Sequence, residues 1–365
     1  MASSWPANLI VCDPSSLSVQ ELVKNPLPSL PQRYIREDHY QFSETEILTD
    51  AAPIPILDMN LLLSGEHTEA ELQKLHSSCT DWGIFQVVNH GVSEEELEKL
   101  RTEIEEFFRL PLQEKMKYKI RPGDVEGYGT VIRSQDQKQD WCDRFYMTIN
   151  PIHQRKPYLF PELPSSLRTI LDLYIQKVQN LGMTVVGLLE KALKMEGREM
   201  REVFEDGMQS LRMTYYPPCP KPELVMGFGA HSDATVITIL NQINGVSGLQ
   251  VKKNGVWLPV NILPNALVVN AGDILEIMSN GVYRSAEHRA TVNSNKERIS
   301  LALFFLAKLD SEIGPAKSLM SPENPPLFKS IGMEKFVHDF FSRKQQGKSF
   351  LEHLRIKKEH ATSTV

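Results

Sequence analysis

A histidine and an aspartate two residues apart form the first pattern in the sequence that could hold a metal ion. His231 and Asp233 lie in a β-rich stretch, and residues i and i+2 of an extended strand point to the same side. An imidazole and a carboxylate placed in this way can converge on one ion. The pattern is weak by itself, because the chain has 10 histidines, although only His231 has an aspartate two positions later.

His288 could supply a third ligand. It lies several predicted strands further along the chain, and a jelly roll could return it to the first pair. Two neutral imidazoles and one carboxylate on one face of a metal are typical of Fe(II) oxygenases. Three ligands leave positions open for a chelating cosubstrate and O₂, whereas structural zinc sites usually close with four. On spacing alone, two ordinary histidines near sheet turns explain the pattern equally well.

A basic residue and a hydroxyl shortly after His288 favour the metal interpretation. Arg298 and Ser300 are again two residues apart in a predicted strand. A buried guanidinium can bind a carboxylate through two charge-assisted hydrogen bonds, and a serine hydroxyl can add another. A dicarboxylate such as 2-oxoglutarate could chelate iron at one end and reach this clamp with the other. A surface ion pair beside an ordinary strand serine is the alternative, and the neighbouring metal-type residues make it the weaker one.

The order of these motifs resembles the plant 2-oxoglutarate- and Fe(II)-dependent dioxygenases. Three further segments strengthen the resemblance: residues 82–91 (WGIFQVVNHG), 215–220 (YYPPCP) and 270–281 (NAGDILEIMSNG). Together the motifs cover about residues 53–310 of the chain. Residues 124–129 (DVEGYG) are similar to the branch that holds alkaloid O-demethylases and norcoclaurine-synthase-like proteins.

The resemblance implies a mixed α and β fold, with a double-stranded β-helix (jelly roll) core and flanking helices. It also implies that Tyr216 lends its hydroxyl to the 2-oxoglutarate end held by Arg298 and Ser300. Thr214 stands where the family commonly has Asn. Asn offers a donor and an acceptor, whereas Thr has one shorter hydroxyl, so Thr214 bears on the affinity or orientation of the cosubstrate.

The resemblance further places Tyr128, Arg212, Phe304 and Leu306 in the substrate pocket. An aromatic floor with few charges suits a flat, mostly apolar ring system. Phe304 and Leu306 could instead alternate into the core, Tyr128 could simply belong to a turn between two glycines, and Arg212 could pair with an acid elsewhere.

The activity implied by the resemblance is hydroxylation or O- or N-demethylation of a plant specialised metabolite, with release of succinate and CO₂. The cofactors would be Fe(II), 2-oxoglutarate as cosubstrate and O₂, with ascorbate helpful. An alkaloid is the first expectation for the substrate, and a flavonoid or other phenolic the second. Two alternatives stay open: an iron oxidase of the same fold that uses no 2-oxoglutarate, and a catalytically silent jelly-roll binding protein. An assay without 2-oxoglutarate distinguishes the iron oxidase from the 2-oxoglutarate-dependent dioxygenase.

The elements that must position these residues can be located along the chain. Helices are expected at residues 19–24, 68–80, 93–109, 165–195, 336–341 and 349–355, with Ser93 and Glu96 as a capping box. Short β-rich runs bounded by Gly, Asn or Pro follow residue 211. They are Arg212–Tyr216, Val236–Leu240, Leu249–Lys253, Val256–Val260, Ala266–Asn270, Ile274–Met278, His288–Val292 and Arg298–Phe305. The predicted organisation is an N-terminal arm (1–52), a mainly helical region packed on the core (53–210), the jelly-roll catalytic core (211–310) and a C-terminal helical segment (311–365).

The composition is that of a soluble globular protein. The chain has 365 residues, 41% of them hydrophobic, and its net charge of −6 argues against a general affinity for nucleic acid or anionic membranes. It has no apolar run long enough for a transmembrane helix, and its first residues lack the basic start of a signal peptide. The four cysteines are far apart. We therefore expect a cytoplasmic protein, monomeric, whose partner is a small-molecule substrate.

Overall fold

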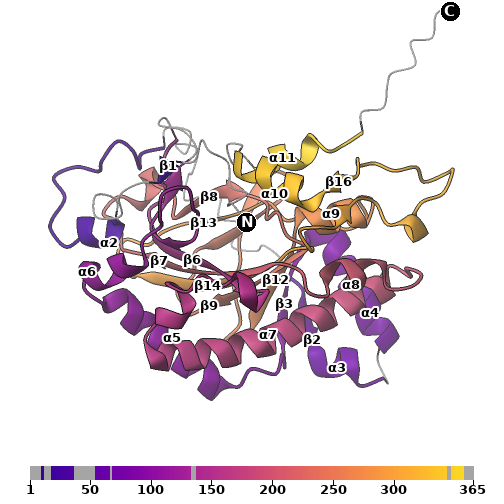
Figure 1. The fold of residues 1–365 in the computed structure, drawn as a ribbon, viewed down its shortest axis with the longest axis horizontal. Coiled ribbons are helices and arrows are strands. Elements are labelled where there is room, and N and C mark those ends of the chain that lie inside the picture. The colour runs from indigo at the N-terminus through magenta and orange to yellow at the C-terminus, as the bar shows by residue number, and fades with distance from the viewer. Residues whose placement is uncertain are drawn as a thin grey trace, which may run out of the picture.

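The computed structural model describes residues 10–11, 18–36, 54–65, 68–132, 137–342 and 347–356 (Figure 1). Part of the predicted arm, including Cys12, lies outside the described residues, and so does the end of the C-terminal segment.

Two sheets form the centre of the molecule. The larger has the strand order β2-β3-β12-β9-β14-β7-β6-β4, and the smaller has the order β11-β10-β13-β8. β2 and β3 run parallel, and the other neighbouring strands run antiparallel. Residues of both sheets line one cavity, so the sheets form its two walls. This is the jelly roll that the sequence predicted.

Seven of the eight β-rich runs predicted after residue 211 form strands whose bounds lie within a few residues of the prediction, whereas β6 and β8 were not among the predicted runs. The larger sheet contains β2 (Ile56–Asp58), β3 (Ile84–Val88), β4 (Gly127–Tyr128), β6 (Asp143–Asn150), β7 (Gln209–Tyr216), β9 (Ile237–Gln242), β12 (Leu267–Ala271) and β14 (Arg298–Phe305). The smaller contains β8 (Phe228–His231), β10 (Leu249–Lys253), β11 (Val256–Pro259) and β13 (His288–Ala290). Two short pairs lie outside these sheets: β1 (Ile10–Val11) with β5 (Val131–Ile132), and β15 (Glu312–Ile313) with β16 (Ile331–Gly332).

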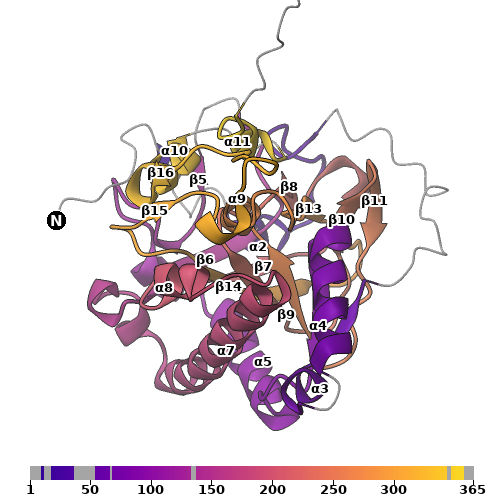
Figure 2. The same ribbon diagram turned by 90° about the vertical axis from the view of Figure 1, so that its right-hand side faces the viewer.

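Helices between residues 59 and 204 precede the core strands, and α5 and α7 pack along one side of the sheets, as Figures 1 and 2 show. The helices of this region are α3 (Met59–Leu63), α4 (Thr68–Ser77), α5 (Glu94–Arg109), α6 (Leu112–Lys115), α7 (Ser165–Ala192) and α8 (Glu199–Phe204). One hydrophobic cluster joins buried side chains of α4, α5 and α7 to the larger sheet. Burial of these apolar faces is the main force that holds the helices on the sheet.

The start of α5 shows how the sequence sets a helix boundary. Ser93 Oγ accepts a hydrogen bond from the Glu96 amide, and Glu96 accepts one from the Ser93 amide, which is the predicted capping box. Leu97, Leu100 and Ile104 share the buried face of the helix. Loss of the Ser93 cap should cost about 1 kcal/mol of stability.

One predicted strand is wrong. Residues Ile274–Met278 form part of the helix α9 (Asp273–Met278), in which every residue is buried. A short, wholly buried apolar run has no solvent-facing side, so its periodicity cannot separate strand from helix. The amides of Asp273 and Ile274 donate to the carbonyls of Asp233 and Thr235, which joins α9 to the chain beside the predicted metal site.

The C-terminal helices α10 (Met333–Ser342) and α11 (Ser349–Glu352) lie on the side of the sheets opposite α5 and α7 (Figures 1 and 2). Glu276 of α9 is buried and holds this segment through ion pairs with Lys348 Nζ at 2.6 Å and Arg355 Nη2 at 2.5 Å. These ion pairs fasten the segment around α11 to α9.

The region of residues 53–210 holds the long helices α5 and α7, and it also completes the larger sheet. β2, β3, β4 and β6 come from this region, and two of them join it to the core: β3 pairs with β12, and β6 pairs with β7. The predicted boundary at residue 210 therefore does not separate two sheets, because β6 pairs with β7 over almost its whole length.

The described part of the N-terminal arm is fastened to β6. The short helix α2 (Val19–Leu22) begins at Ser18, and the buried Asp143 carboxylate accepts bonds from Ser18 Oγ at 2.6 Å and the Val19 amide at 2.7 Å. Further along the arm, Arg36 Nη2 donates to Asp140 Oδ1 at 2.7 Å. The arm thus helps to fix the start of β6, which borders the site described below.

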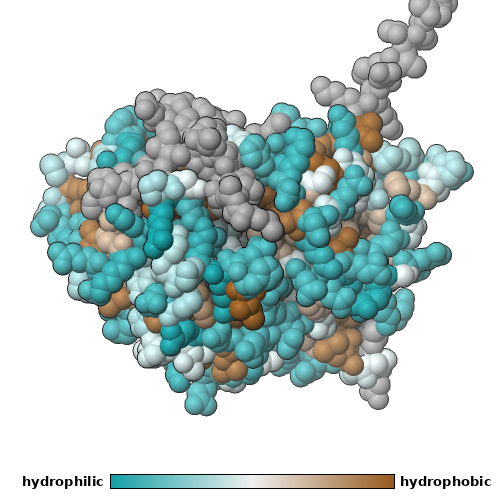
Figure 3. All heavy atoms as spheres, viewed as in Figure 1, coloured by the Kyte–Doolittle hydropathy of each residue, from teal (hydrophilic) through white to brown (hydrophobic). Residues whose placement is uncertain are grey.

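The surface is mixed in polarity. On the face seen in Figure 3, hydrophobic residues outside the grey atoms form small separate groups among hydrophilic ones. Among the described residues, no helix is both long enough and apolar enough to cross a membrane.

Candidate active site

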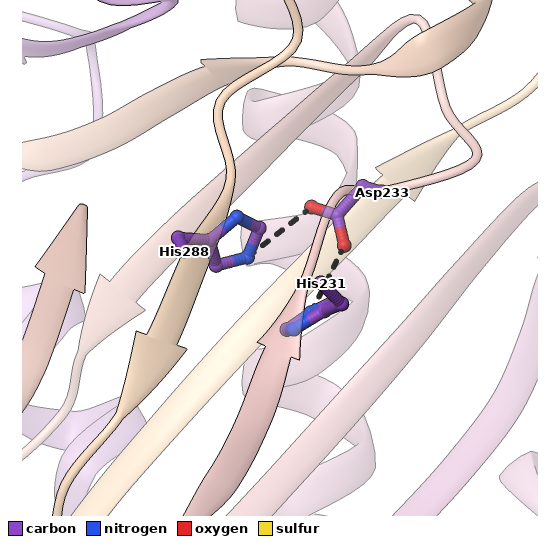
Figure 4. A group of neighbouring side chains, drawn as sticks. All are labelled: His231, Asp233 and His288. Atoms are coloured by element: carbon purple, nitrogen blue, oxygen red, sulfur yellow. Dashed lines mark ion pairs between the residues drawn. The ribbon is translucent and has the colours of Figure 1, made fainter. Parts of the chain in front are cut away.

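The structure brings together the three residues that the sequence singled out as metal ligands. His231 ends β8, Asp233 follows it, and His288 begins β13. One side-chain ligand atom from each lies within 4.8 Å of the others, and the side chains converge as Figure 4 shows. His231 Nε2 is 3.4 Å from Asp233 Oδ1, and His288 Nε2 is 3.8 Å from Asp233 Oδ2. The spatial prediction for this triad is confirmed.

Backbone contacts orient both imidazoles. His231 Nδ1 lies 2.8 Å from the Gly229 carbonyl, and His288 Nδ1 lies 2.9 Å from the Ala286 carbonyl. A carbonyl can only accept, so each Nδ1 carries the proton and each Nε2 presents a lone pair to the centre of the triad. Among the residues that the structure describes, the buried His231 Nε2 has no hydrogen-bond partner. A buried acceptor with no partner is costly, and a metal ion at the centre would satisfy it.

The electrostatics of the triad suit a cation. Burial raises the pKa of Asp233, but the neighbouring His288 and His231 and a hydrogen bond from Asn270 outweigh it, so this pKa lies well below its usual range. Burial and the adjacent His231 lower the pKa of His288 to about 4. At neutral pH, Asp233 is a carboxylate and His288 is a neutral imidazole, which are the forms that bind a metal.

Two polar residues that the sequence did not reveal hold the Asp233 carboxylate. Thr238 Oγ1 donates to Asp233 Oδ2 at 2.7 Å, and Asn270 Nδ2 donates to the same oxygen at 2.9 Å. Thr238 lies on β9 and Asn270 on the neighbouring β12, where the two residues are directly paired. Such contacts orient a ligating carboxylate and commonly affect metal affinity. Asn270 belongs to a segment that carried the family resemblance, but no pattern in the sequence pointed to Thr238.

The predicted carboxylate clamp lies in the same cavity as the triad. Arg298, Ser300 and Tyr216 line this cavity together with His231, Asp233 and His288. Arg298 is 2% exposed, and its Nε and Nη1 atoms have no hydrogen-bond partner within the described part of the chain. Among the described residues, Arg298 forms no ion pair, so its alternative role in a surface ion pair is wrong. A dicarboxylate that spans the cavity would satisfy both this guanidinium and the triad.

Strand pairing sets the geometry of the clamp. Arg298 lies directly opposite Tyr216 where β14 pairs with β7, and its guanidinium carbon is 4.9 Å from the centre of the Tyr216 ring. Gly248 lies against the same side chain: a methyl group at Gly248 would come within 2.8 Å of Arg298 Cδ. Thr214 is buried directly opposite Ser300, but it is not among the residues that line the cavity.

A second cavity opens from the triad toward α10. Its lining is mostly apolar and aromatic, and it includes Arg212, Phe304 and Leu306, three of the residues that the resemblance assigned to the substrate pocket. Arg212, Phe228, His231, Asp233 and Phe304 line both cavities, so the two meet at the triad. The arrangement leaves one space beside the clamp and another beside the apolar wall, with the triad between them.

The pocket assignment of Tyr128 is corrected. Tyr128 is buried and packs in the main hydrophobic cluster, and its hydroxyl donates to Asp143 Oδ2 at 2.9 Å. It does not line the second cavity, although its neighbour Gly129 does. The side chain of Tyr128 therefore supports the wall of the cavity from behind. Tyr146 and the C-terminal residues Val337, Phe340 and Phe341 line the cavity instead, and the sequence did not identify them.

A jelly roll that holds two histidines, an aspartate and a carboxylate clamp around one cavity defines the class of non-haem iron oxygenases. Comparison with known proteins agrees. Residues 207–307 match the family described as the 2OG-Fe(II) oxygenase superfamily, and residues 54–164 match the family described as non-haem dioxygenase in morphine synthesis N-terminal.

Individual relatives span nearly the whole chain. Codeine O-demethylase of Papaver somniferum is 48% identical over 93% of this chain and 96% of its own length. Oxoglutarate-dependent flavonoid 7-O-demethylase 1 of Ocimum basilicum is 47% identical over 93% of this chain and 91% of its own. A crystal structure of JOX2 in complex with 2OG, Fe and JA matches with a TM-score of 0.83 and 35% identity, covering 93% of this chain and 98% of that one.

The chain belongs to the 2OG-Fe(II) oxygenase superfamily. It is an enzyme, a dioxygenase that depends on 2-oxoglutarate and Fe(II), rather than the silent binding protein or the 2-oxoglutarate-independent oxidase that the sequence alone also allowed.

Proposed function

We propose that this dioxygenase O-demethylates a flat aromatic plant specialised metabolite, with hydroxylation as the same reaction on a substrate that has no methyl ether at the reacting position. The observation that carries the proposal is the junction of the two cavities at His231 and Asp233. A ring system against Phe228 and Phe304 would present one edge to the triad, while 2-oxoglutarate reaches it from the other side.

We assign the roles of the site residues as follows. His231, Asp233 and His288 hold the iron, and Thr238 and Asn270 fix the Asp233 carboxylate. Arg298 and Ser300 hold the far carboxylate of 2-oxoglutarate, with help from the Tyr216 hydroxyl. When bound, Fe(II) and 2-oxoglutarate supply the oxidation of a substrate C–H bond by O₂, with release of succinate and CO₂. The protein's own contribution is to position one C–H bond beside the triad and to exclude water.

The chemistry of a methyl ether explains why hydroxylation and demethylation belong together. Hydroxylation of the methyl group gives a hemiacetal, R–O–CH₂–OH. The bond between the ether oxygen and this carbon then breaks, the ether oxygen keeps the electron pair and takes up the hydroxyl proton, and formaldehyde leaves. One oxygen atom of O₂ ends in succinate and the other in formaldehyde. An N-methyl group would react in the same way.

The relatives support demethylation more specifically than they support one substrate. The names of the two demethylases given above share O-demethylation but differ in substrate, codeine in one and a flavonoid in the other. Their identities to this chain, 48% and 47%, do not separate an alkaloid from a flavonoid.

The test is an assay of the Fe(II)-loaded enzyme with O₂ and 2-oxoglutarate against methoxylated alkaloids, flavonoids and simpler phenolic ethers. We expect at least one methyl ether to lose its methyl group, with an equal amount of trapped formaldehyde. If every methyl ether tested is hydroxylated on its ring and none releases formaldehyde, the enzyme is an oxygenase but not an O-demethylase.

A further inference from the structure

The second cavity contains few charged groups, and they are unevenly paired. Among the described residues that line it, the charged side chains are Asp140, Arg144, Arg212 and Asp233. The charges of the two carboxylates and the two guanidinium groups would cancel if all four groups were available to a ligand. The hydrogen bonds and ion pairs show that the carboxylates are less available than the guanidinium group of Arg212.

Both carboxylates are already engaged. Asp140 accepts from Arg36 Nη2 at 2.7 Å and from the Gly229 amide at 2.9 Å, and its other oxygen is 3.4 Å from Arg144 Nη2. Asp233 belongs to the triad and is held by Thr238 and Asn270. Neither carboxylate is therefore left to neutralise a cation on the substrate.

Arg212 is the charged group that remains. In the part of the chain that the structure describes, it forms no ion pair and donates no hydrogen bond, and its Nε atom is buried without a partner. The guanidinium carbon lies 4.4 Å from the centre of the Phe228 ring and 4.9 Å from that of Phe304. These aromatic contacts fix the position of the group but leave its N–H donors unused, which is unfavourable for a partly buried cation.

Arg212 also sits between the two cavities, directly opposite Tyr146 of β6 on one side and Ala302 of β14 on the other. Arg144 is two residues before Tyr146 on β6, so it faces the same side of the sheet, and its guanidinium carbon is 5.0 Å from the Phe228 ring. Two guanidinium groups thus flank one aromatic ring, with one shared carboxylate between Arg144 and Arg36.

We propose that Arg212 is the specificity-determining residue of the substrate cavity, and that it binds an acidic oxygen, a phenolic hydroxyl or a carboxylate, on an aromatic methyl ether. The inference rests on the proposed function and narrows its substrate class. It favours phenolic substrates over alkaloids that carry a protonated amine, which reverses the order expected from family resemblance. A protonated amine in this cavity would meet Arg212 and Arg144 with no free carboxylate.

A matched set of ligands tests the preference directly. The set is 4′-methoxyflavone that carries, at position 7, a hydroxyl, a methoxyl, a carboxylate or an aminomethyl group. Calorimetric titrations use enzyme loaded with Fe(II) and 2-oxoglutarate under strictly anaerobic conditions, so that no turnover occurs. We expect the hydroxyl or the carboxylate ligand to bind roughly 10-fold or more tightly than the methoxyl ligand, and the ammonium ligand to bind most weakly.

Three variants connect this preference to the residue. Arg212→Gln should reduce the preference for the acidic ligand to about 2-fold or less, and Arg212→Lys, which keeps the charge, should retain part of it. Arg198→Gln is the matched control, because Arg198 is an exposed arginine directly before α8 and lines neither cavity. Unchanged thermal melting and unchanged 2-oxoglutarate affinity in Arg212→Gln would show that the site is intact. Loss of 2-oxoglutarate binding without loss of the ligand preference would overturn the proposal, since Arg212 would then serve the cosubstrate.

A spectroscopic probe provides a second, independent test of the role of Arg212. The phenolate of 2-methoxy-4-nitrophenol absorbs visible light and its phenol form does not, so absorption reports its ionisation when bound to the Mn(II)- and 2-oxoglutarate-loaded enzyme. A nearby guanidinium should lower the pKa of the bound phenol by about 1 unit relative to water, in the native protein and in Arg198→Gln but not in Arg212→Gln. If the pKa of the bound phenol is lowered equally in Arg212→Gln, the proposal is overturned. The proposal is also overturned if no acidic ligand binds more tightly than the methoxyl and ammonium ligands.

The experiments distinguish failure of this inference from failure of the proposed function. If demethylation proceeds but ammonium ligands bind as well as acidic ones, the proposed function stands and the role of Arg212 falls. If acidic ligands bind through Arg212 but no methyl ether is demethylated, the role of Arg212 stands and O-demethylation falls.

Discussion

His288 lies directly opposite His231 where β13 pairs with β8, and the centres of the two imidazole rings are 4.3 Å apart. This cross-strand pair brings together two residues that are far apart in the sequence. Each ring is also tied by its Nδ1 atom to a carbonyl two residues earlier, so the register of two strands and two local contacts fix both Nε2 atoms. The sheet therefore positions the two imidazoles, and Asp233, which lies just beyond the end of β8, is held by Thr238 and Asn270.

Replacement of the carboxylate of the triad should remove the metal. We expect Asp233→Ala to retain essentially no iron after desalting and to show no turnover, because two neutral imidazoles remain without an anionic ligand. Metal analysis of the purified variant checks this. Asp172→Ala is the control, since Asp172 is a partly exposed residue paired with Arg155 far from either cavity. Normal iron content in Asp233→Ala would show that the metal is held elsewhere.

The residues behind Asp233 should tune metal affinity without abolishing it. Thr238→Val removes one of two donors to Asp233 Oδ2 and nearly keeps the side-chain volume. We expect iron affinity to fall roughly 10- to 100-fold. A competition titration against a chelator measures the change, with the surface variant Thr169→Val on α7 for comparison. Equal affinities in the two variants would leave Thr238 with a structural role alone.

Loss of the clamp should affect the cosubstrate and not the metal. Arg298→Ala should weaken 2-oxoglutarate binding by roughly 100-fold or more, because a buried carboxylate would lose its charged partner. Iron content should stay that of the native enzyme. Equilibrium binding of 2-oxoglutarate to the anaerobic iron form, with Arg198→Ala as the control, distinguishes the two effects. An unchanged dissociation constant for 2-oxoglutarate would refute the clamp.

A substitution at Thr214 is expected to strengthen the binding of 2-oxoglutarate rather than weaken it. It lies directly opposite Ser300, and Thr214→Asn would restore the residue that the family commonly carries. If the longer amide reaches the cosubstrate, 2-oxoglutarate should bind more tightly, since Asn can both donate and accept. The same binding measurement applies. No change in affinity would mean that this position does not contact 2-oxoglutarate.

Tyr128 should matter for stability and not for substrate binding. Tyr128→Phe removes the hydroxyl that donates to Asp143 Oδ2, and we expect a loss of about 1 kcal/mol in the free energy of unfolding. The KM for the substrate should stay the same, because the ring lies behind the cavity wall. Denaturant unfolding and steady-state kinetics together check this, and a large rise in KM with unchanged stability would return Tyr128 to the pocket.

The sequence was most informative where local rules act. The alternation of side chains along strands predicted that His231 and Asp233, and Arg298 and Ser300, share a side, and the capping box at Ser93 is present as predicted. The return of His288 to the pair depended on the jelly-roll topology, which the series of short predicted strands suggested and the family resemblance also implied. Expectations of a cytoplasmic, monomeric protein stay predictions.

Features that depend on long-range packing could not be read in advance. The helix α9 was mistaken for a strand because it is buried on all sides, and Tyr128 was misplaced because a turn motif does not show which way its ring points. The support of Asp233 by Thr238 arises from β9 folding beside the triad, and the isolation of Arg212 is visible only when both cavity carboxylates are seen to be engaged.

The most direct test of the account is the balance between succinate and demethylated product. The Fe(II)-loaded enzyme is given O₂ and a methoxylated phenol that it accepts, with and without 2-oxoglutarate. We predict equal amounts of succinate, formaldehyde and demethylated product, and none of the three when 2-oxoglutarate is withheld. Product formation that continues without 2-oxoglutarate, or succinate that forms at the same rate without substrate, would contradict the joint action of the triad, the clamp and the substrate cavity.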